Sequence, residues 1–249
     1  MSLRFARQVE ASLSIRRVAR TFFRLTGVRS FVQSEGFWWY RWHSDAGIGF
    51  SEDWERPIQE HILHPGSCFV DAGSHVGRWS IRASRLYERI LAFEPDPFTN
   101  YVLRRNIARN DIHNILVFAT ALSDHRDKAV LFSYGPPACN SLRSAHISGL
   151  VARAGNPVRV RPLDDFTSYF LSPMILKIDV EGEELKVLEG ATRTLNEYEP
   201  TIVMEVHFRN DLEQITELLK RHDYDMMAIS PEGPNPPGQV YLVAKRSHE

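Results

Sequence analysis

The stretch Cys68-Phe69-Val70-Asp71-Ala72-Gly73-Ser74-His75-Val76-Gly77 decides the fold expected for this chain. Its apolar start predicts a buried strand, Asp71 and two glycines predict a turn, and a helical pattern begins at Trp79. In open α/β sheets, a strand that leads through a glycine turn into a helix forms a nucleotide crevice. Glycine permits the tight turn, and the helix N-terminus offers unpaired N–H groups. The same pattern also fits an ordinary strand–turn–helix unit without a ligand.

A carboxylate after the next predicted strand narrows the choice of ligand. The apolar run from Ile90 ends in Glu94, about 20 residues after the turn, where a carboxylate accepts both hydroxyls of a ribose. A dinucleotide site has three glycines spaced G-x-G-x-x-G, whereas this turn has two glycines with another spacing. The pattern therefore suits S-adenosylmethionine at least as well as NAD, and an NAD-dependent oxidoreductase stays as the alternative.

Composition excludes several classes of protein. The 249 residues are 43% hydrophobic, enough for a substantial core, and the net charge of −1 gives no overall attraction to nucleic acid. The two cysteines, Cys68 and Cys139, are far apart and form neither a zinc-type pair nor a disulfide scaffold. No apolar run reaches membrane-spanning length. We therefore expect a cytoplasmic protein with no nucleic-acid partner.

Strand and helix signals alternate along most of the chain, which predicts a parallel, doubly wound sheet. A final hairpin would add an antiparallel strand to that sheet. We expect residues 1–60 to form an N-terminal extension and residues 61–249 to form one catalytic domain. The expected strands are 68–70, 90–96, 115–119, 128–133, a run from Met174, 201–207, 225–229 and 239–244. The expected helices are 52–63, 79–83, 98–110, 185–195 and 211–221, with Ser51 and Asn210 as N-caps.

Three segments outside this pattern are candidates for contact with an acceptor or a membrane. Residues 1–30 read as basic amphipathic helices, which suit either a peripheral membrane contact or a cap beside the cleft; we favour the cap. The aromatic run Gly36–Trp42 suits either a platform for a sugar or a hairpin on the sheet edge, and we favour the hairpin. Gly135–Pro157, which contains Asn140-Ser141, predicts a lid or insertion.

Ionisable side chains follow several of the predicted strands. In parallel sheets ligands bind beyond the carboxyl ends of the strands, so these groups should converge on one rim. They are Asp71, Glu94, Asp179, Glu205 and His207. We expect Asp71 to fix the glycine turn by accepting backbone N–H groups and Glu94 to bind a ribose.

The other three rim residues would face an acceptor substrate. His207, with an ordinary pKa near 6.5, is the candidate general base. Asp179 and Glu205 could instead hold a divalent cation that lowers the pKa of a bound hydroxyl. The alternative is a structural network in which Lys177 pairs with one of these acids.

Six motifs, taken together and in this order, resemble the FkbM family of S-adenosylmethionine-dependent methyltransferases. They are Phe69–Gly77, Ala92–Pro95, Ala121–Asp124, Leu163–Asp165, Leu176–Glu184 and Glu205–His207. The resemblance spans about Pro65 to His207, and the block Lys177-Ile178-Asp179-Val180-Glu181-Gly182-Glu183-Glu184 is its most specific part. It implies the class I methyltransferase fold, an α/β Rossmann-like fold whose seven-stranded, mostly parallel sheet has an antiparallel last strand.

The resemblance also implies site residues. The cofactor-binding residues would be Asp71, Gly73, Ser74, His75, Gly77, Glu94, Pro95, Ala121 and Leu122, with the last two near the adenine. The catalytic residues would be Lys177, Asp179, Glu205 and His207. Asp179 falls where catechol-type O-methyltransferases place a metal-binding aspartate, and Glu205 falls near their next ligand. The turn departs from the family pattern, which has Ala-Asn where this chain has Ser74-His75.

The sequence therefore predicts an S-adenosylmethionine-dependent O-methyltransferase. Its acceptor would be a small molecule or carbohydrate, with methylation of a sugar hydroxyl in a glycan, glycolipid or natural product. The alternatives are the NAD-dependent oxidoreductase and a non-catalytic binding protein on a methyltransferase fold. The missing third glycine argues against the first, and the acids at Glu94 and Asp179 argue against the second.

Overall fold

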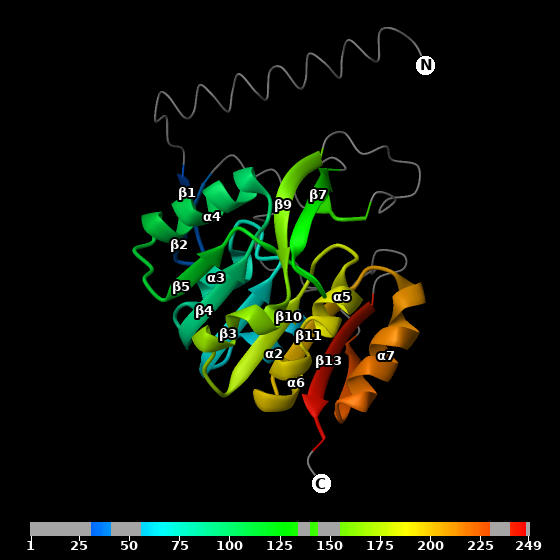
Figure 1. The fold of residues 1–249 in the computed structure, drawn as a ribbon. Helices are drawn as coiled ribbons and strands as arrows, with labels where there is room; N and C mark the ends of the chain where they lie inside the picture. Colours follow the sequence, from blue (N-terminus) through cyan, green and yellow to red (C-terminus); the bar gives the residue numbers. More distant parts are fainter. Residues whose placement is uncertain (1–30, 41–55, 134–139, 144–154, 230–239, 248–249) are drawn as a thin grey trace, which may run out of the picture.

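A seven-stranded sheet forms the centre of the molecule (Figure 1). The structure is a computed structural model that describes residues 31–40, 56–133, 140–143, 155–229 and 240–247. The strands of this sheet are β3 (Gly66–Ala72), β4 (Tyr87–Phe93), β5 (Ile115–Phe118), β10 (Met174–Ile178), β11 (Thr201–Val206), β12 (Tyr224–Ile229) and β13 (Val240–Arg246).

The strand order is β12-β13-β11-β10-β3-β4-β5. All neighbours from β11 to β5 pair in parallel, whereas β13 is antiparallel to both β11 and β12. The parallel sheet and the terminal antiparallel strand are therefore confirmed. Because β3, β4, β10 and β11 all run in one direction, their carboxyl ends meet at one rim.

Helices cover both faces of the central sheet, and each face has its own hydrophobic core. Val70 packs in one core and its neighbour Phe69 in the other, because successive side chains of a strand point to opposite faces. The helices are α2 (Arg56–Ile62), α3 (Arg78–Ala83), α4 (Pro97–Arg109), α5 (Glu184–Glu189), α6 (Thr192–Glu197) and α7 (Leu212–Arg221), with short 3-10 helices η3 (Leu163–Tyr169) and η4 (Arg209–Asp211). Helix α2 spans the predicted domain boundary at residue 60, and that boundary stays a prediction.

Two expected helices differ from the structure. The helix expected over 185–195 is divided into α5 and α6 at Gly190, where a Cβ would lie 2.0 Å from the Ser123 carbonyl oxygen. Asp164 then accepts the backbone N–H and the hydroxyl of Thr194 within the first turn of α6. Helix α7 begins at Leu212 after η4, so Asn210 is not its N-cap. Ser51 lies outside the described residues.

A second, four-stranded sheet was not expected. Its strands are β6 (Ala121–Leu122), β7 (Asp127–Ser133), β8 (Asn140–Ser141) and β9 (Gly155–Arg161), in the order β6-β9-β7-β8. The prediction that Gly135–Pro157 is loop throughout is wrong at both ends of its described part, because Asn140-Ser141 and Gly155–Pro157 are strand residues. Alternate residues Val158 and Val160 of β9 pack on Ala121 and Leu131. Figure 1 shows β7 and β9 beyond the central sheet, between α4 and α5.

The aromatic run forms a hairpin of β1 (Phe31–Ser34) and β2 (Phe37–Tyr40), as predicted. It docks on α4 and not on the sheet edge: Asn106 Oδ1 accepts the N–H of Tyr40, and Asn110 bonds both the N–H and the carbonyl oxygen of Trp38. The side-chain amides of α4 thereby satisfy the open edge of β2. Residues 1–30, 41 and 42 lie outside the described part of the chain.

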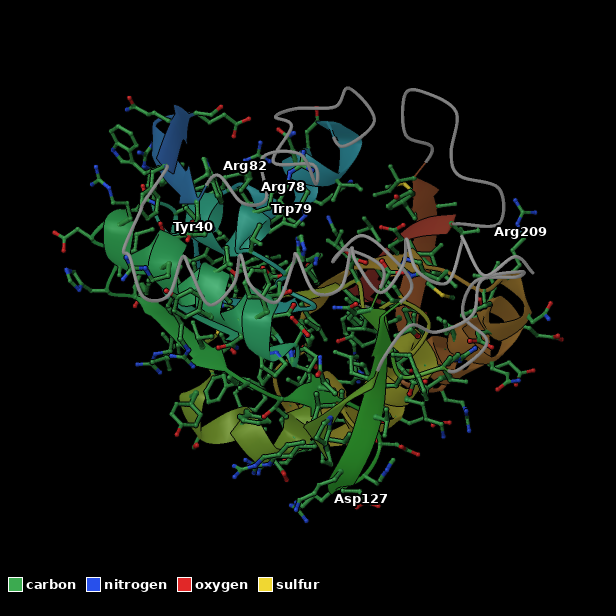
Figure 2. The ribbon with its side chains drawn as sticks, turned by 90° about the horizontal axis from the view of Figure 1, so that it is seen from above. Tyr40, Arg78, Trp79, Arg82, Asp127 and Arg209 are labelled. Atoms are coloured by element: carbon green, nitrogen blue, oxygen red, sulfur yellow. The ribbon has the colours of Figure 1, made fainter. Side chains whose placement is uncertain are left out.

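A bidentate ion pair also anchors the hairpin. Glu35, in the turn between β1 and β2, accepts from Arg82 Nε and Nη2 at 2.6 and 2.5 Å. Seen from above, Arg82 lies beside Arg78 and Trp79 of α3, on the same side of the molecule as Tyr40 (Figure 2). Within the described residues, no helix is long and apolar enough to cross a membrane.

Asn106 joins the hairpin to the glycine turn, and its removal should be costly. Its side chain is fully buried, accepts the Tyr40 N–H at 2.8 Å and donates to the Val76 carbonyl oxygen at 2.9 Å. Asn106→Leu leaves both backbone groups unpaired, so we expect a loss of about 2–4 kcal/mol in the free energy of unfolding, measured by urea titration. The control Tyr101→Leu, at an exposed position of α4, should change it by less than about 0.5 kcal/mol. Equal stability of the two variants would contradict this role.

Candidate functional site

The glycine turn lies between the ends of β3, β4 and β10. Gly73 has φ 79°, and a Cβ at this position would lie 1.8 Å from the carbonyl oxygen of Asp179. Only glycine lets β3 turn this close to the end of β10. The backbone N–H groups of Gly73 and Ser74 donate to the carbonyl oxygen of Phe93 at 3.1 and 2.9 Å. The turn therefore connects the ends of three neighbouring strands.

A buried ammonium group holds the same strand ends together. Lys177 Nζ lies 3.1 Å from Asp71 Oδ1 and 3.3 Å from Asp179 Oδ2, and it donates to the Gly73 carbonyl oxygen at 3.0 Å. Burial alone would lower the pKa of Lys177, but the two carboxylates outweigh it and hold that pKa above its usual value. Lys177 is thus a permanent cation among acids, as the structural alternative required, and its catalytic role stays a prediction.

Asp71 supports the turn from inside. It is fully buried, and its Oδ2 accepts the backbone N–H of Ser80 at 3.2 Å and the Ser80 hydroxyl at 2.6 Å. Asp71 was expected to fix the glycine turn by accepting backbone N–H groups; it accepts one, from Ser80 of α3, which follows the turn. Direct contact between Asp71 and a cofactor stays a prediction.

Glu94 lies at the end of β4, against the glycine turn. Its Oε1 accepts the N–H of Asp96 at 2.8 Å, and the backbone N–H of His75 also donates to this carboxylate. Burial, together with the charge of Asp96, raises the pKa of Glu94 to about 8. In the absence of a ligand, this carboxyl group is therefore protonated in most molecules at pH 7.

The remaining expected cofactor residues are distributed around this turn. Ser74 is buried, and its Oγ has no hydrogen-bond partner among the described residues. His75 has φ 50°, a left-handed conformation, and Gly77 has φ 94° beside Leu103 of α4. Pro95 follows Glu94 and is partly buried. Ala121 and Leu122 belong to β6, which pairs with β9 of the second sheet.

The three acceptor-side residues also come together, at the ends of β10 and β11. One potential ligand atom from each of Asp179, Glu205 and His207 lies within 4.8 Å of the other two. His207 Nε2 is 3.5 Å from Glu205 Oε1 and 3.9 Å from Asp179 Oδ1. On its other side, His207 Nδ1 is 2.8 Å from Glu184 Oε1. We call Asp179, Glu205 and His207 the acid–histidine cluster.

The acid–histidine cluster has altered protonation. Burial alone would lower the pKa of His207, but Glu184, Glu181 and Asp179 raise it to about 10. Burial and the charge of Asp179 raise the pKa of Glu205 to about 8. His207 therefore does not keep its unperturbed pKa near 6.5: Glu184, Glu181 and Asp179 stabilise the imidazolium, which prevails at neutral pH, and the role of His207 as general base stays a prediction.

Two glutamates of this region were not predicted as site residues. Glu184 is fully buried, and its Oε1 accepts the backbone N–H of Gly182 as well as facing His207. Glu181 Oε2 lies 3.5 Å from His207 Nε2. Both belong to the Lys177–Glu184 block, so the signal was present in the sequence. The sequence did not reveal the turn at Gly182, whose φ is 104°. This turn directs both acids back to His207.

Residues of the second sheet form hydrogen bonds at both sides of the rim. Asn156 of β9 donates from Nδ2 to Asp96 Oδ2 at 3.1 Å, next to Glu94. Ser141 of β8 donates from its hydroxyl to the Glu181 carbonyl oxygen at 2.6 Å. The Asn140-Ser141 pair expected near an acceptor is thus placed beside the acid–histidine cluster, although its contact with an acceptor stays a prediction. Trp38, which was also expected near an acceptor, donates its backbone N–H to Asn110 at the end of α4.

A donor set of two carboxylates and one imidazole nitrogen fits a divalent cation chemically. Glu184, on the opposite ring nitrogen, would orient His207 as carboxylates do behind metal-bound histidines. Without a metal, the imidazolium and Lys177 balance part of the negative charge themselves. Both cation binding and a purely protonated network are therefore compatible with these residues.

Comparison with known proteins identifies relatives over most of the chain. Residues 71–226 match the family model described as Methyltransferase FkbM domain. Methyltransferase sdnD of Sordaria araneosa is 30% identical over 213 residues, which cover 72% of this chain and 81% of that protein. Hexuronic acid methyltransferase AglP of Haloferax volcanii is 27% identical over 151 residues, covering 60% of this chain and 59% of that protein.

A solved structure shares the fold. Methyltransferase FkbM from Methylobacillus flagellatus superposes with a TM-score of 0.55 at 20% identity and covers 78% of this chain. The aligned region covers 48% of that longer chain. The fold is therefore that of class I methyltransferases, as the motifs implied.

Loss of the buried ammonium should strongly destabilise the site. Lys177→Met leaves Asp71 and Asp179 without their common cation, so we expect a loss of about 3–5 kcal/mol in urea unfolding. The double variant Asp71→Asn/Lys177→Met should lose less than the sum of the two single variants. The surface lysine Lys186, changed to Met, should cost at most about 1 kcal/mol. Additive losses would refute the coupling.

Proposed function

This chain belongs to the FkbM methyltransferase family, and on that basis we propose that it transfers the methyl group of S-adenosylmethionine to a hydroxyl oxygen of an acceptor. One observation carries the proposal: the glycine turn, with Glu94 beside it, lies on the same rim as the acid–histidine cluster. Lys177 joins the two. Cofactor and acceptor could therefore meet across the end of β10.

The residues around the glycine turn fit S-adenosylmethionine. Gly73 lets the turn approach the end of β10 closely, Ser74 Oγ is a buried group without a partner among the described residues, and Glu94 presents a carboxyl group next to them. Ser74 and His75, although they depart from the family pattern, keep their backbone N–H groups on Phe93 and Glu94. When bound, the cofactor supplies an electrophilic methyl group on sulfur.

The acid–histidine cluster would receive the proton of the acceptor hydroxyl. Methyl transfer is an in-line displacement, so the oxygen must be aligned and must lose its proton. Because His207 is mostly protonated at neutral pH, we assign proton transfer to the cluster as a unit and not to His207 alone. Asp179 is its most exposed member, with 33% of its side chain accessible, and would contact the acceptor first.

We propose a sugar hydroxyl as the acceptor, in a glycan, glycolipid or natural product. The relative AglP is named a hexuronic acid methyltransferase, which supports a carbohydrate. The rim also offers the hydrogen-bonding side chains of Asn140 and Ser141, and Asn140 Oδ1 is buried without a partner among the described residues. A carbohydrate, rich in hydroxyl donors, suits such acceptors.

We further propose that Asp179, Glu205 and His207 hold a divalent cation. The supporting observation is the convergence of their ligand atoms, with Glu184 orienting the imidazole from behind. Bound there, a cation would lower the pKa of a coordinated hydroxyl. The imidazolium proton would have to leave when the cation binds, because a metal ligand must be neutral.

Cofactor binding should depend on pH through Glu94. Ribose hydroxyls donate to the carboxylate form, whose fraction rises as the pH passes about 8. S-adenosylhomocysteine affinity should therefore increase roughly tenfold from pH 7 to pH 9, and binding at pH 7 should release a proton. Calorimetry in two buffers with different ionisation enthalpies measures both effects.

Matched variants separate the ionisation of Glu94 from that of the amino group of S-adenosylhomocysteine, because both ionisations can make binding depend on pH. Glu94→Gln should bind more weakly at pH 9 and should lose the additional pH dependence, because an amide does not ionise. Glu88→Gln, at an exposed site of the same strand, should behave like the wild type. No binding to wild type would refute the cofactor proposal, whereas a pH response that persists in Glu94→Gln would refute only the assignment to Glu94.

The acid–histidine cluster should affect turnover and cation binding without affecting the cofactor. Asp179→Ala and His207→Ala should each reduce methyl transfer by at least about 100-fold, with S-adenosylhomocysteine affinity unchanged. Both should also abolish Mn²⁺ binding seen in calorimetry with wild type. His222→Ala, a histidine bonded to Asn196, is the control and should retain all three properties. Full turnover after EDTA treatment would rule out the cation but not the proton transfer.

A further inference from the structure

A pocket lies away from the rim, between the hairpin and the C-terminal half of α4. Its volume is about 430 Å³, and it is lined by Phe31, Trp38, Arg105, Ala108 and Arg109. This volume is within the range of small-ligand sites, which extends from about 300 to 1,000 Å³. None of the residues assigned to the cofactor or the acid–histidine cluster contributes to it.

The pocket carries two positive charges that have no counter-ion among the described residues. Arg105 and Arg109 are four residues apart on α4, so their side chains share one face of the helix and repel each other. Neither forms an ion pair within the described part of the chain, and the buried Nε of Arg105 has no hydrogen-bond partner there. Arg104, by contrast, donates to Asn100 and to the Val117 carbonyl oxygen. A buried N–H donor without a partner is costly and indicates a missing acceptor.

The aromatic residues fix the shape of this pocket. The Arg109 guanidinium lies 4.5 Å from the ring centroid of Trp38 and 5.7 Å from that of Phe31. A guanidinium placed over a ring keeps its planar N–H donors available at the edge, where a carboxylate or phosphate binds. Phe31 also packs edge-to-face on Tyr40, with centroids 5.4 Å apart. The walls are therefore a flat apolar surface next to two guanidinium groups.

The pocket is also preformed. Asn110 accepts the Trp38 N–H and donates to the Trp38 carbonyl oxygen, which fixes the backbone that carries the indole ring. The ion pair of Glu35 with Arg82 holds the hairpin turn from the opposite side. A ligand would find this site without first having to order the hairpin, which reduces the entropy cost of binding.

Charge argues against the N-terminal segment as the occupant. Residues 1–30 contain seven arginines and a single acidic residue, Glu10. Two unneutralised arginines would repel such a segment. The occupant that complements the pocket is an anion.

We propose that this pocket binds a sugar ring that carries an oxyanion, either a carboxylate or a phosphate. The oxyanion would accept from Arg105 and Arg109, and the ring would lie against Trp38 and Phe31. Helix α4 begins at the rim after Asp96, and these arginines follow 9 and 13 residues later, about 14 to 20 Å along the helix. The site is thus separate from the methyl-transfer rim and does not depend on the function proposed for it.

Calorimetry with the full chain tests the proposal. Glucuronate and glucose 6-phosphate are the two anionic probes, glucose is the neutral probe, and inorganic phosphate is the probe without a ring. We expect one anionic sugar to bind at one site per chain, more weakly at higher salt, with no binding of glucose. Whichever of the two sugars binds more tightly identifies the carboxylate or the phosphate as the natural group.

Variants on α4 decide whether this pocket is responsible. Arg105→Gln and Arg109→Gln should each weaken binding at least about tenfold, a loss typical of a charge-assisted hydrogen bond. Arg104→Gln, whose arginine points away to Val117, should bind like the wild type. S-adenosylhomocysteine affinity should be the same in all four proteins. Arg105→Gln is the safest variant for folding, because Arg105 forms no side-chain hydrogen bond or ion pair with the described residues.

Two results would overturn the proposal. One is the absence of binding for both anionic sugars at concentrations up to about 10 mM, beyond the range of weak specific ligands. The other is unchanged affinity in Arg105→Gln and Arg109→Gln, which would place the binding elsewhere. Inorganic phosphate that binds as tightly as glucose 6-phosphate would remove the role of the aromatic wall.

Discussion

The buried ammonium of Lys177 between Asp71 and Asp179 is the interaction on which the site depends. Asp71 and Lys177 are register partners on the adjacent parallel strands β3 and β10, and Asp179, two residues beyond Lys177, lies on the same face. Each charge would be costly if buried alone. Together with the Gly73 carbonyl oxygen, they fix the turn, the end of β10 and the position of Asp179 at once. The glycine turn and the acid–histidine cluster are thus both held by the charges around Lys177.

This arrangement explains the protonation around the rim. Among the described residues, Lys177 and His207 supply positive charge to the cluster, and each already faces carboxylates. Burial, reinforced by the charge of Asp96 at Glu94 and of Asp179 at Glu205, raises the pKa values of both groups to about 8. These two acids lie at the two sides of the rim, and their ionisation becomes favourable only when a hydrogen-bond donor or a cation is added. If the rim binds a cofactor or a cation as proposed, that binding should release protons.

The sequence predicted the central sheet well because its signals are local. Apolar runs such as Cys68–Val70 and the helix from Phe98 have clear periodicity, and Glu94 and His207 directly follow strands. The second sheet was missed because β9 begins with Gly155-Asn156-Pro157, residues typical of turns, and is held by pairing with β7. The protonation of His207 could not be predicted, because Glu181 and Glu184 reach it only through a left-handed turn. The hairpin was predicted, but its contact with α4 depends on Asn106 and Asn110, which a sequence pattern does not connect to β2.

The second sheet, with residues 121–161, lies within the region that matches the family model. That region, residues 71–226, also contains the glycine turn and the acid–histidine cluster, whereas the hairpin 31–40 precedes it. The contacts of Lys177 with Asp71, Asp179 and the Gly73 carbonyl oxygen hold the strand ends of this region in place. Other elements are attached to the outside of the central sheet. The hairpin on α4 and the second sheet that reaches Asp96 and Glu181 are such elements, each held by a few polar contacts. Substitutions in these polar contacts should therefore loosen the outer elements while the buried contacts of Lys177 with Asp71 and Asp179 continue to hold the strand ends at the rim.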